Sequence, residues 1–225
     1  MSSWNQTRLP RRAPPRLYPI PIHTTPTFHI LIATAGRPCL KRMLDSLKNE
    51  LTEKDAITIV FDGEESFERS TFTQEWLKDH HAKIHLIKQY TQLGSWGHGV
   101  RNQYQGKLHM KTTYIMHADD DDVYVKGSFE YLRQRCISSH TLYIASMIHS
   151  HTHQVLPPFG HRRIEQEKIG TPCGIIPFES ADKAVWKDRI GGDFDYYHAL
   201  QNHVANLMFL DYIIYQIPHA LQLIA

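Results

Sequence analysis

The residues best suited to chemistry are four consecutive aspartates, Asp119 to Asp122, which directly follow an apolar, β-prone run from Tyr114 to Ala118. A buried strand that ends in carboxylates presents them at its carboxyl end, where open α/β sheets bind their ligands. Adjacent anions repel one another, and an oxygen-only cluster suits Mg²⁺ or Mn²⁺ as a shared cation. A solvated acidic turn is the alternative interpretation. We favour the metal site, since clustered carboxylates of this kind are associated with functional sites.

Two further carboxylates occupy positions where they can act. Asp62 ends the apolar run from Ile57 to Phe61 and precedes a glycine. It is expected either to accept an N–H or hydroxyl group of a ligand or to cap a turn. Asp193 follows two glycines at the start of an expected helix, where it is a candidate general base or a helix cap.

A stretch with three glycines, Gly94 to Gly99, opens a predicted helix that carries Arg101. Glycines let the backbone come close to a ligand, and a helix N-terminus favours anions. The spacing matches neither a phosphate-binding P-loop nor a dinucleotide-binding fingerprint, so this stretch is a weak signal by itself.

Strands and helices alternate along the first half of the chain, and this order positions the candidate residues. Apolar runs predict strands over residues 28–33, 57–61, 84–87 and 114–118. Helical spacing of leucines predicts a helix over residues 40–51, and a second helix is expected over 70–80. The alternation predicts an α/β fold with a central, mainly parallel sheet flanked by helices.

The second half is less regular and predicts a smaller antiparallel part. Strands are expected over residues 142–148 and 207–215. The apolar segment 169–177 is rich in turn formers and is expected to line a pocket floor. A helix is expected from Gly191 and Gly192 to about residue 204.

Length and composition limit the classes of protein to consider. The 225 residues fit one domain, residues 28–225, preceded by a Pro- and Arg-rich tail, residues 1–27, that is expected to be disordered. A formal net charge of +2 argues against a nucleic-acid binder. The three cysteines form no CxxC pair, which fits a reducing compartment. With no secretory signal and no transmembrane segment expected, a cytoplasmic location is predicted.

Six segments, in this order, resemble the GT-A-fold, family-2-type nucleotide-sugar glycosyltransferases, and within them the small glycosyltransferase domain encoded by chlorella viruses. They are FHILIATAGRPCL (28–40), IVFDG (59–63), GSWGHGVRN (94–102), MHADDDDVY (116–124), IGTPCGIIPF (169–178) and GGD (191–193). The resemblance implies a single GT-A (Rossmann-like) domain. It also implies metal-dependent transfer of a sugar from a UDP-sugar to a hydroxyl of a glycan or glycoprotein, with inversion at the anomeric carbon.

The resemblance further implies roles for individual residues. It assigns the nucleotide-sugar site to Thr34, Ala35, Arg37, Asp62, Gly94, Trp96, Arg101, Asp119 and Asp120. It assigns the Mn²⁺ or Mg²⁺ ion on the donor diphosphate to Asp121 and Asp122, with the frame of the four acids ambiguous by one residue. Asp193 matches the catalytic base of inverting members. Asp195 is its rival, because Gly192 stands where the family usually has a glutamate.

Other classes of function share some of these features. A metal-dependent nucleotidyltransferase would use the same sheet and acids, and Arg37 in the first loop would grip its triphosphate. A non-catalytic carbohydrate- or protein-binding module would keep the fold but not need the acids, so the intact Asp119 to Asp122 run and Asp193 argue against it. Stacking of Trp96, Phe159 or Trp186 on a sugar is a further expectation, although aromatic residues are more often part of the core.

Overall fold

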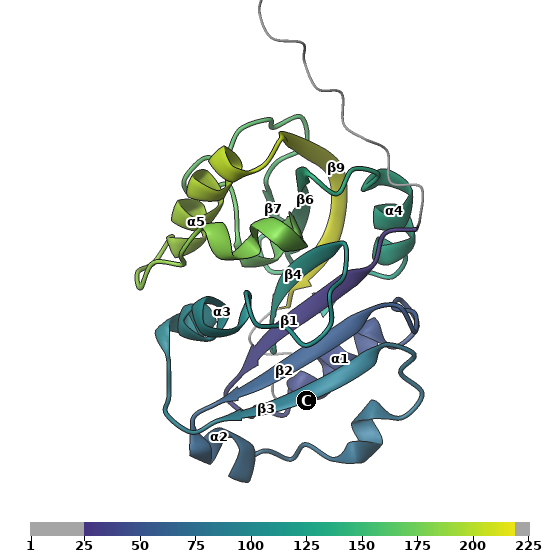
Figure 1. Ribbon diagram of the computed structural model, residues 1–225, viewed down its shortest axis with the longest axis vertical. Helices are drawn as coiled ribbons and strands as arrows, with labels where there is room; N and C mark the ends of the chain where they lie inside the picture. Colours follow the sequence, from purple (N-terminus) through teal and green to yellow (C-terminus); the bar gives the residue numbers. More distant parts are fainter. Residues whose placement is uncertain (1–24, 219–225) are drawn as a thin grey trace, which may run out of the picture.

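The computed structural model describes residues 25–218 (Figure 1). Most of the tail predicted for residues 1–27 lies outside these residues, and the first strand begins at Phe28. Nine strands form one sheet in the order β3-β2-β1-β4-β8-β6-β9-β5, with β7 paired to β6. The predicted α/β architecture, with a mainly parallel sheet and a smaller antiparallel part, is confirmed.

The strands are β1 (Phe28–Thr34), β2 (Ala56–Asp62), β3 (Lys83–Gln89), β4 (Tyr114–Asp119), β5 (Val123–Tyr124), β6 (Thr141–His149), β7 (Val155–Leu156), β8 (Gly174–Pro177) and β9 (Asn206–Ile217). The α-helices are α1 (Leu40–Leu47), α2 (Glu64–Glu68), α3 (His98–Tyr104), α4 (Ser128–Arg135) and α5 (Gly192–Leu200). Short 3₁₀ helices are η1 (Gln74–Leu77), η2 (Ser95–Gly97), η3 (Thr171–Cys173), η4 (Phe178–Lys183) and η5 (Gln201–His203).

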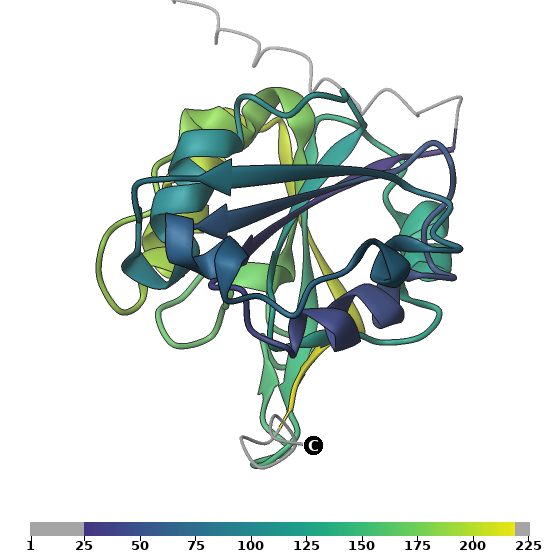
Figure 2. The same cartoon turned by 90° about the horizontal axis from the view of Figure 1, so that it is seen from below.

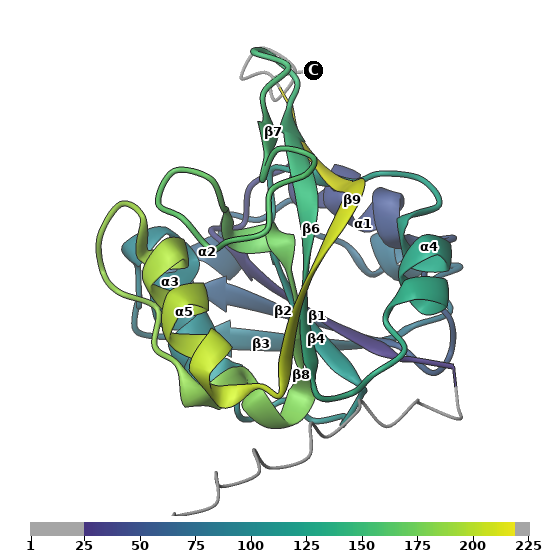
Figure 3. The ribbon, with the colours of Figure 1, turned by 90° about the horizontal axis from the view of Figure 1, so that it is seen from above.

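Strands β1 to β4 form the parallel part that carries the candidate site. β1 pairs in parallel with β2 and with β4, and every residue of β1 is buried. A strand covered on both faces reads as a continuous apolar run, which explains why β1 was predictable from the sequence. Helices α1 and α4 lie on one side of the sheet, and α3 and α5 lie on the other (Figure 3).

The second half of the chain extends the sheet in mixed directions. β8 is antiparallel to both β4 and β6, while β9 runs parallel to β6. The ends of β6 and β9, together with β7, project from the body of the domain (Figures 2 and 3). Among residues 25–218, no helix is long and apolar enough to cross a membrane.

Two predicted segments differ from the structure. The helix expected over residues 70–80 is wrong, because only the short η1 forms there. Phe72 packs against Phe61 of β2 and against Trp76, with ring centroids 5.6 Å apart in both pairs, so this segment covers the sheet as an irregular chain. The segment 169–177 forms η3, in which Thr171, Pro172 and Cys173 are buried, and strand β8 of the sheet, and none of its residues lines the two cavities at the ends of the parallel strands.

A buried histidine in β1 makes the fold sensitive to acid. The Nδ1 atom of His29 donates to the carbonyl of Met110 at 3.0 Å, and its Nε2 atom accepts from the Thr58 hydroxyl at 2.8 Å. Burial, with a smaller contribution from the neighbouring His109 and His85, lowers the pKa of His29 to about 4. The unfolded chain takes up a proton below about pH 6.5 and the folded chain does not, so stability falls as the pH drops from about 6.5 towards 4.

We expect His29→Gln to remove this part of the acid sensitivity. For the wild type, protonation of His29 in the unfolded chain lowers the free energy of unfolding by about 2 kcal/mol between neutral pH and about pH 5. Over this pH interval the free energy of unfolding of the variant should fall by about 2 kcal/mol less than that of the wild type, as measured by urea denaturation at both pH values. His203→Gln, at an exposed position, is the matched control and should behave like the wild type. An unchanged pH dependence in His29→Gln would refute the assignment.

Candidate active site

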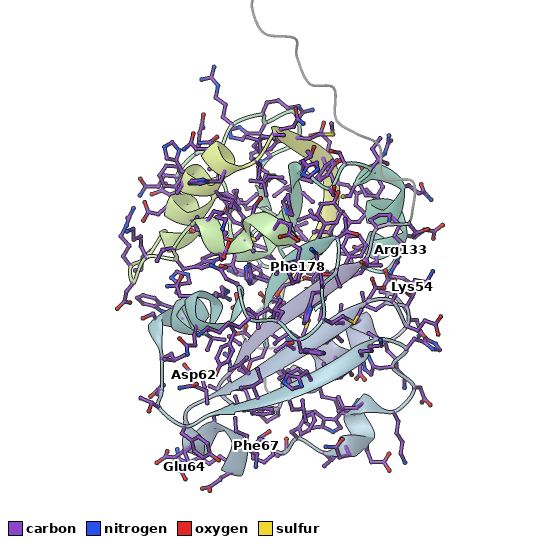
Figure 4. All side chains as sticks on the ribbon, in the orientation of Figure 1. Lys54, Asp62, Glu64, Phe67, Arg133 and Phe178 are labelled. Carbon is purple, nitrogen blue, oxygen red and sulfur yellow. The ribbon has the colours of Figure 1, made fainter. Side chains whose placement is uncertain are left out.

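The carboxyl ends of β1, β2 and β4 lie together because these strands are parallel neighbours. Figure 4 shows Asp62 and Glu64 at this end of the sheet, with Lys54 and Arg133 at the opposite end. A cavity of about 380 Å³ opens there. It is lined by Ala33, Thr34, Ala35, Arg37, Asp62, Gln92, Gly94, Trp96, Gly97, Asp119, Asp120 and Asp121.

The structure therefore brings together most of the residues expected to hold a nucleotide-sugar. Eight of the nine line this cavity: Thr34, Ala35, Arg37, Asp62, Gly94, Trp96, Asp119 and Asp120. The ninth, Arg101, is buried and reaches the cavity through its ion pair with Asp119. Asp121 also lines the cavity, whereas Asp122 does not. The roles of these residues stay predictions.

The four aspartates contact different parts of the chain. Asp119 accepts from Arg101, and its backbone N–H donates to the Tyr215 hydroxyl at 3.0 Å. Asp119 and Asp121 remain 34% and 28% exposed, while Asp120 and Asp122 are buried. The accessible carboxylates are therefore the alternate ones, Asp119 and Asp121.

Burial and mutual repulsion shape the titration of the acidic run. Burial, followed by the neighbouring carboxylates of Asp119 and Asp121, raises the pKa of Asp122 to about 8. Burial also raises the pKa of Asp120, although the hydrogen bonds from Arg37 and Thr34 act in the opposite direction. Burial and repulsion thus disfavour the ionised form of these two carboxylates, and a nearby positive charge acts in the opposite direction and stabilises it.

The carboxylate oxygens of the acidic run are the type of ligand that a hard divalent cation prefers. Among residues 25–218, no group of three or more His, Cys, Asp or Glu side chains is gathered so as to hold a metal ion. Mg²⁺ sites, however, commonly use one or two carboxylates together with water and substrate phosphates. Asp121, partly exposed in the cavity wall, with Asp119 beside it, is suited to such a site. Asp122 is buried outside the cavity lining, so its assignment as a metal ligand gains no support.

The loop after β1 is joined to the acidic run. The Thr34 hydroxyl donates to Asp120 at 2.5 Å, and Arg37 donates to both Asp120 and Asp121. Gly36 has a φ of +79°, and a Cβ atom there would lie 1.8 Å from the carbonyl oxygen of Ser66. Only glycine fits at this position, which explains the turn that places Arg37 over the acids.

Asp62 has a structural role that the sequence did not reveal. Its two carboxylate oxygens accept the backbone N–H groups of Leu93 and Gly94 at 2.7 and 2.8 Å. Asp62 thus fixes the start of the glycine-rich loop in the cavity wall. This contact lies about thirty residues along the chain, so no local motif could have indicated it.

The glycine-rich loop presents a tryptophan at the cavity. Ser95 and Trp96 have φ values of +58° and +52°, a conformation that costs about 1–3 kcal/mol for each non-glycine residue. Arg101 helps to hold this loop, because its guanidinium donates to the Trp96 carbonyl at 2.9 Å. The Trp96 side chain is 66% exposed, so its ring is accessible to a ligand.

A second cavity of about 370 Å³ continues beyond Asp62. It shares Ala35, Asp62 and Gln92 with the first, which makes one extended cleft along the ends of the strands. Its other lining residues are Gly63, Glu64, Glu65, Ser66, Arg69 and Tyr90. Of these other residues, the sequence analysis named only Gly63. The rest were missed because α2 and the end of β3 were not expected to border a site.

Asp193 and Asp195 differ in their surroundings at the start of α5. Asp195 forms a two-pronged ion pair with Arg189, with both N–O distances at 2.7 Å. Asp193 accepts a hydrogen bond from the N–H of the adjacent Phe194 at 2.8 Å, and burial raises its pKa, opposed by that hydrogen bond and by His98. Its raised pKa suits Asp193 as a general base, whereas Asp195 is held in the ion pair with Arg189.

Gly192 is in tight contact with the segment before α5. A Cβ atom there would lie 2.3 Å from the Lys187 carbonyl oxygen and 2.7 Å from the His98 ring. A glutamate, which the sequence resemblance led us to expect at this position, would therefore not fit here. His98, which donates from Nδ1 to the Lys187 carbonyl at 2.8 Å, was missed by the sequence analysis, although it lies within the glycine-rich motif.

The aromatic residues expected to stack on a sugar divide into two groups. Trp186 is only 2% exposed and packs between the rings of Tyr196 and His117, so it is a core residue. Phe159 is exposed but does not line the cavities described above. Trp96 alone of the three borders the candidate site.

Comparisons with known proteins support the fold. The sequence matches no protein-family model and no curated protein. TarS from S. aureus, residues 1–349, superimposes with a TM-score of 0.65 at 13% identity, over 85% of this chain and 60% of that one. The same protein in complex with UDP-GlcNAc gives a TM-score of 0.62 at 13% identity, over 86% of this chain and 58% of that one.

A third solved structure agrees. The mannosyltransferase PcManGT from Pyrobaculum calidifontis, in complex with GDP-Man and Mn²⁺, gives a TM-score of 0.60 at 11% identity, over 89% of this chain and 59% of that one. The fold is GT-A-like. At this identity the likeness establishes the GT-A-like fold alone, and the chain spans less than two thirds of each of these structures.

We expect Asp62→Ala to loosen the glycine-rich loop. The substitution removes two hydrogen bonds to a carboxylate, so it should lower the free energy of unfolding by about 1–3 kcal/mol. The amides of Leu93 and Gly94 should exchange with deuterium faster, as measured by hydrogen exchange with mass spectrometry. Asp62→Asn keeps one acceptor oxygen and should give a smaller effect. Unchanged exchange in Asp62→Ala would show that the loop is held by other contacts.

Proposed function

We propose that this chain is a metal-dependent glycosyltransferase that moves a sugar from a nucleoside-diphosphate donor, with UDP as the nucleotide, to a hydroxyl group of a glycan or glycoprotein. The observation that carries the proposal is the cavity at the ends of β1, β2 and β4, walled by Asp119, Asp120 and Asp121. The cavity lies on a GT-A-like fold, and solved proteins with this fold hold UDP-GlcNAc or GDP-Man with Mn²⁺. The charge and size of the cavity suit a diphosphate with its cation.

The chemistry of transfer calls for stabilisation of the leaving nucleotide. Breaking the bond between the sugar and the diphosphate builds negative charge on the diphosphate. A bound Mn²⁺ or Mg²⁺, held by Asp121 with Asp119 beside it, supplies Lewis-acid stabilisation of that charge. Arg37, half-exposed in the cavity wall, adds a guanidinium that can orient phosphate oxygens.

Activation of the acceptor falls to α5. Asp193 takes the proton from the acceptor hydroxyl as this attacks the anomeric carbon, and the reaction inverts the configuration there. Asp193 does not line the cavity, but its neighbour Gly192 packs tightly against the ring of His98, which lies three residues before Arg101 on α3, and this supports a position of Asp193 on the Arg101 side of the cavity. Asp195 instead orients Arg189, which lies in the segment just before α5.

We also propose a cellular setting for the reaction. The resemblance to the chlorella virus domain suggests a viral enzyme that acts in the host cytoplasm.

Titration calorimetry with UDP, GDP, CDP and ADP, each with and without Mn²⁺, tests the proposal directly. We expect UDP to bind only when Mn²⁺ is present. Asp121→Ala should abolish this metal-dependent binding without unfolding the protein, because removal of one clustered anion relieves repulsion. Asp211→Ala, at an exposed position on β9, is the control and should bind like the wild type.

The possible results separate the candidate functions. If none of the diphosphates binds under either condition, the glycosyltransferase proposal fails and a non-catalytic module is favoured. A further titration with UTP tests the alternative function, because binding of UTP but not of UDP would favour a nucleotidyltransferase. Normal binding of UDP and Mn²⁺ by Asp121→Ala would refute the metal assignment.

The role of Asp193 is tested by a matched pair of substitutions. Asp193→Asn should keep the affinity for UDP and Mn²⁺ but lower the rate of sugar transfer or donor hydrolysis by about 10²- to 10⁴-fold, because the general base is lost. Asp195→Asn should have a smaller effect on the rate. The readout is release of UDP from the UDP-sugar that the protein binds. Full activity in Asp193→Asn would move the base to another residue.

A further inference from the structure

The two arginines that pair with the acidic run differ in how they are held. Arg101 is 1% exposed, and its guanidinium lies 5.3 Å from the Trp186 ring, between the Trp96 carbonyl and Asp119. Arg37 is 48% exposed and borders the cavity. Arg101 is therefore a fixed counterion, while the side chain of Arg37 has room to rearrange.

The two contacts of Arg37 also differ from each other. Asp120 is 1% exposed, and its other carboxylate oxygen is taken by the Thr34 hydroxyl, so this carboxylate is a buried anchor. Asp121 is 28% exposed and lines the cavity, and Arg37 donates to one of its oxygens at 2.7 Å. The contact with Asp121 is the more accessible and the easier to exchange.

A divalent cation would compete with Arg37 for Asp121. Both are positively charged, and both are attracted to the same carboxylate. An arriving diphosphate, in turn, offers the guanidinium a new pair of oxygen atoms, to which its planar fork is well matched. The diphosphate thus draws Arg37 away from Asp121, which leaves this carboxylate free for the cation, and the cation in turn releases Arg37 for the diphosphate.

On this basis, and resting on the proposed function, we propose that Arg37 is an exchangeable counterion. It neutralises Asp121 when the cleft holds no cation, and it transfers its hydrogen bond from Asp121 to the diphosphate when nucleotide and cation bind together. Mn²⁺ alone then binds weakly, because it must displace Arg37. The nucleotide raises the affinity for Mn²⁺, and by linkage Mn²⁺ raises the affinity for the nucleotide by the same factor.

The backbone is arranged so that only the side chain needs to move. The Gly36 N–H donates to the Thr34 hydroxyl oxygen at 2.9 Å, and the turn at Gly36 is packed against Ser66. On the other side, Arg42 donates to the backbone carbonyl of Asp121 at 2.7 Å, which fixes the position of this aspartate. Arg37 therefore stays within reach of both Asp121 and the cavity during the exchange.

The test measures Mn²⁺ binding in the wild type, Arg37→Met and Arg37→Lys. Free Mn²⁺ is followed by electron paramagnetic resonance, with no nucleotide, with UDP, and in parallel with GDP. We expect Arg37→Met to bind Mn²⁺ alone about two- to tenfold more tightly, because the competing ion pair is gone. It should bind the nucleotide about tenfold or more weakly, so that the coupling factor between Mn²⁺ and nucleotide falls towards one.

Two variants keep the interpretation clear. Arg37→Lys retains the charge without the fork and should give an intermediate coupling factor. Arg162→Met is the matched control, because Arg162 is 53% exposed and forms an ion pair with Asp211 on β9. It should leave both affinities unchanged. A urea denaturation curve for each variant establishes that it is folded.

The outcomes separate the inference from the function on which it rests. If the wild type binds Mn²⁺ and UDP or GDP together, but Arg37→Met has the same or a weaker affinity for Mn²⁺ alone, the exchange is refuted and the proposed function stands. An unchanged coupling factor in Arg37→Met refutes it equally. If the wild type binds no nucleotide in the presence of Mn²⁺, the proposed function fails and the inference fails with it.

Discussion

The arrangement of this domain depends on the cost of gathering four carboxylates at the end of one buried strand. Asp120 and Asp122 are almost fully buried, and an isolated buried charge is strongly disfavoured. The chain offsets this with positive charge and hydrogen-bond donors from separate elements: Arg37 and Thr34 from the loop after β1, Arg101 from α3, and the Tyr215 hydroxyl from β9. Because each donor must reach β4, the acids fix where these elements meet.

The same requirement extends to the elements that border the acids. Arg101 is positioned for Asp119 by Trp186 and in turn holds the carbonyl of Trp96, so the loop with two left-handed residues is linked to the acidic run. Asp62 holds the other end of that loop through Leu93 and Gly94. The strain at Ser95 and Trp96 is therefore opposed from both sides, and the exposed tryptophan is kept at the edge of the cavity.

Much of the fold and the place of the site could be predicted from the sequence, and the exceptions have physical causes. β1 and β4 are apolar and covered on both faces, so their composition alone indicates strands. Residues 70–80 have no such signal, because Phe72 and Trp76 pack against the sheet from an irregular chain. The function of Asp62 in holding the loop, and the unequal exposure of the four aspartates, arise from contacts between distant segments that no local pattern contains.

The choice between Asp193 and Asp195 shows how tertiary contacts can give different properties to two carboxylates in one helical turn. Asp195 is neutralised by its ion pair with Arg189. The close packing of Gly192 against Lys187 and His98 brings the helix start near α3, which places Asp193 in a partly buried environment. A side chain at Gly192 would push α5 away from His98. Glycine at position 192 is therefore the condition under which the start of α5 can lie against His98 and place Asp193 within the electrostatic influence of His98 and Arg101.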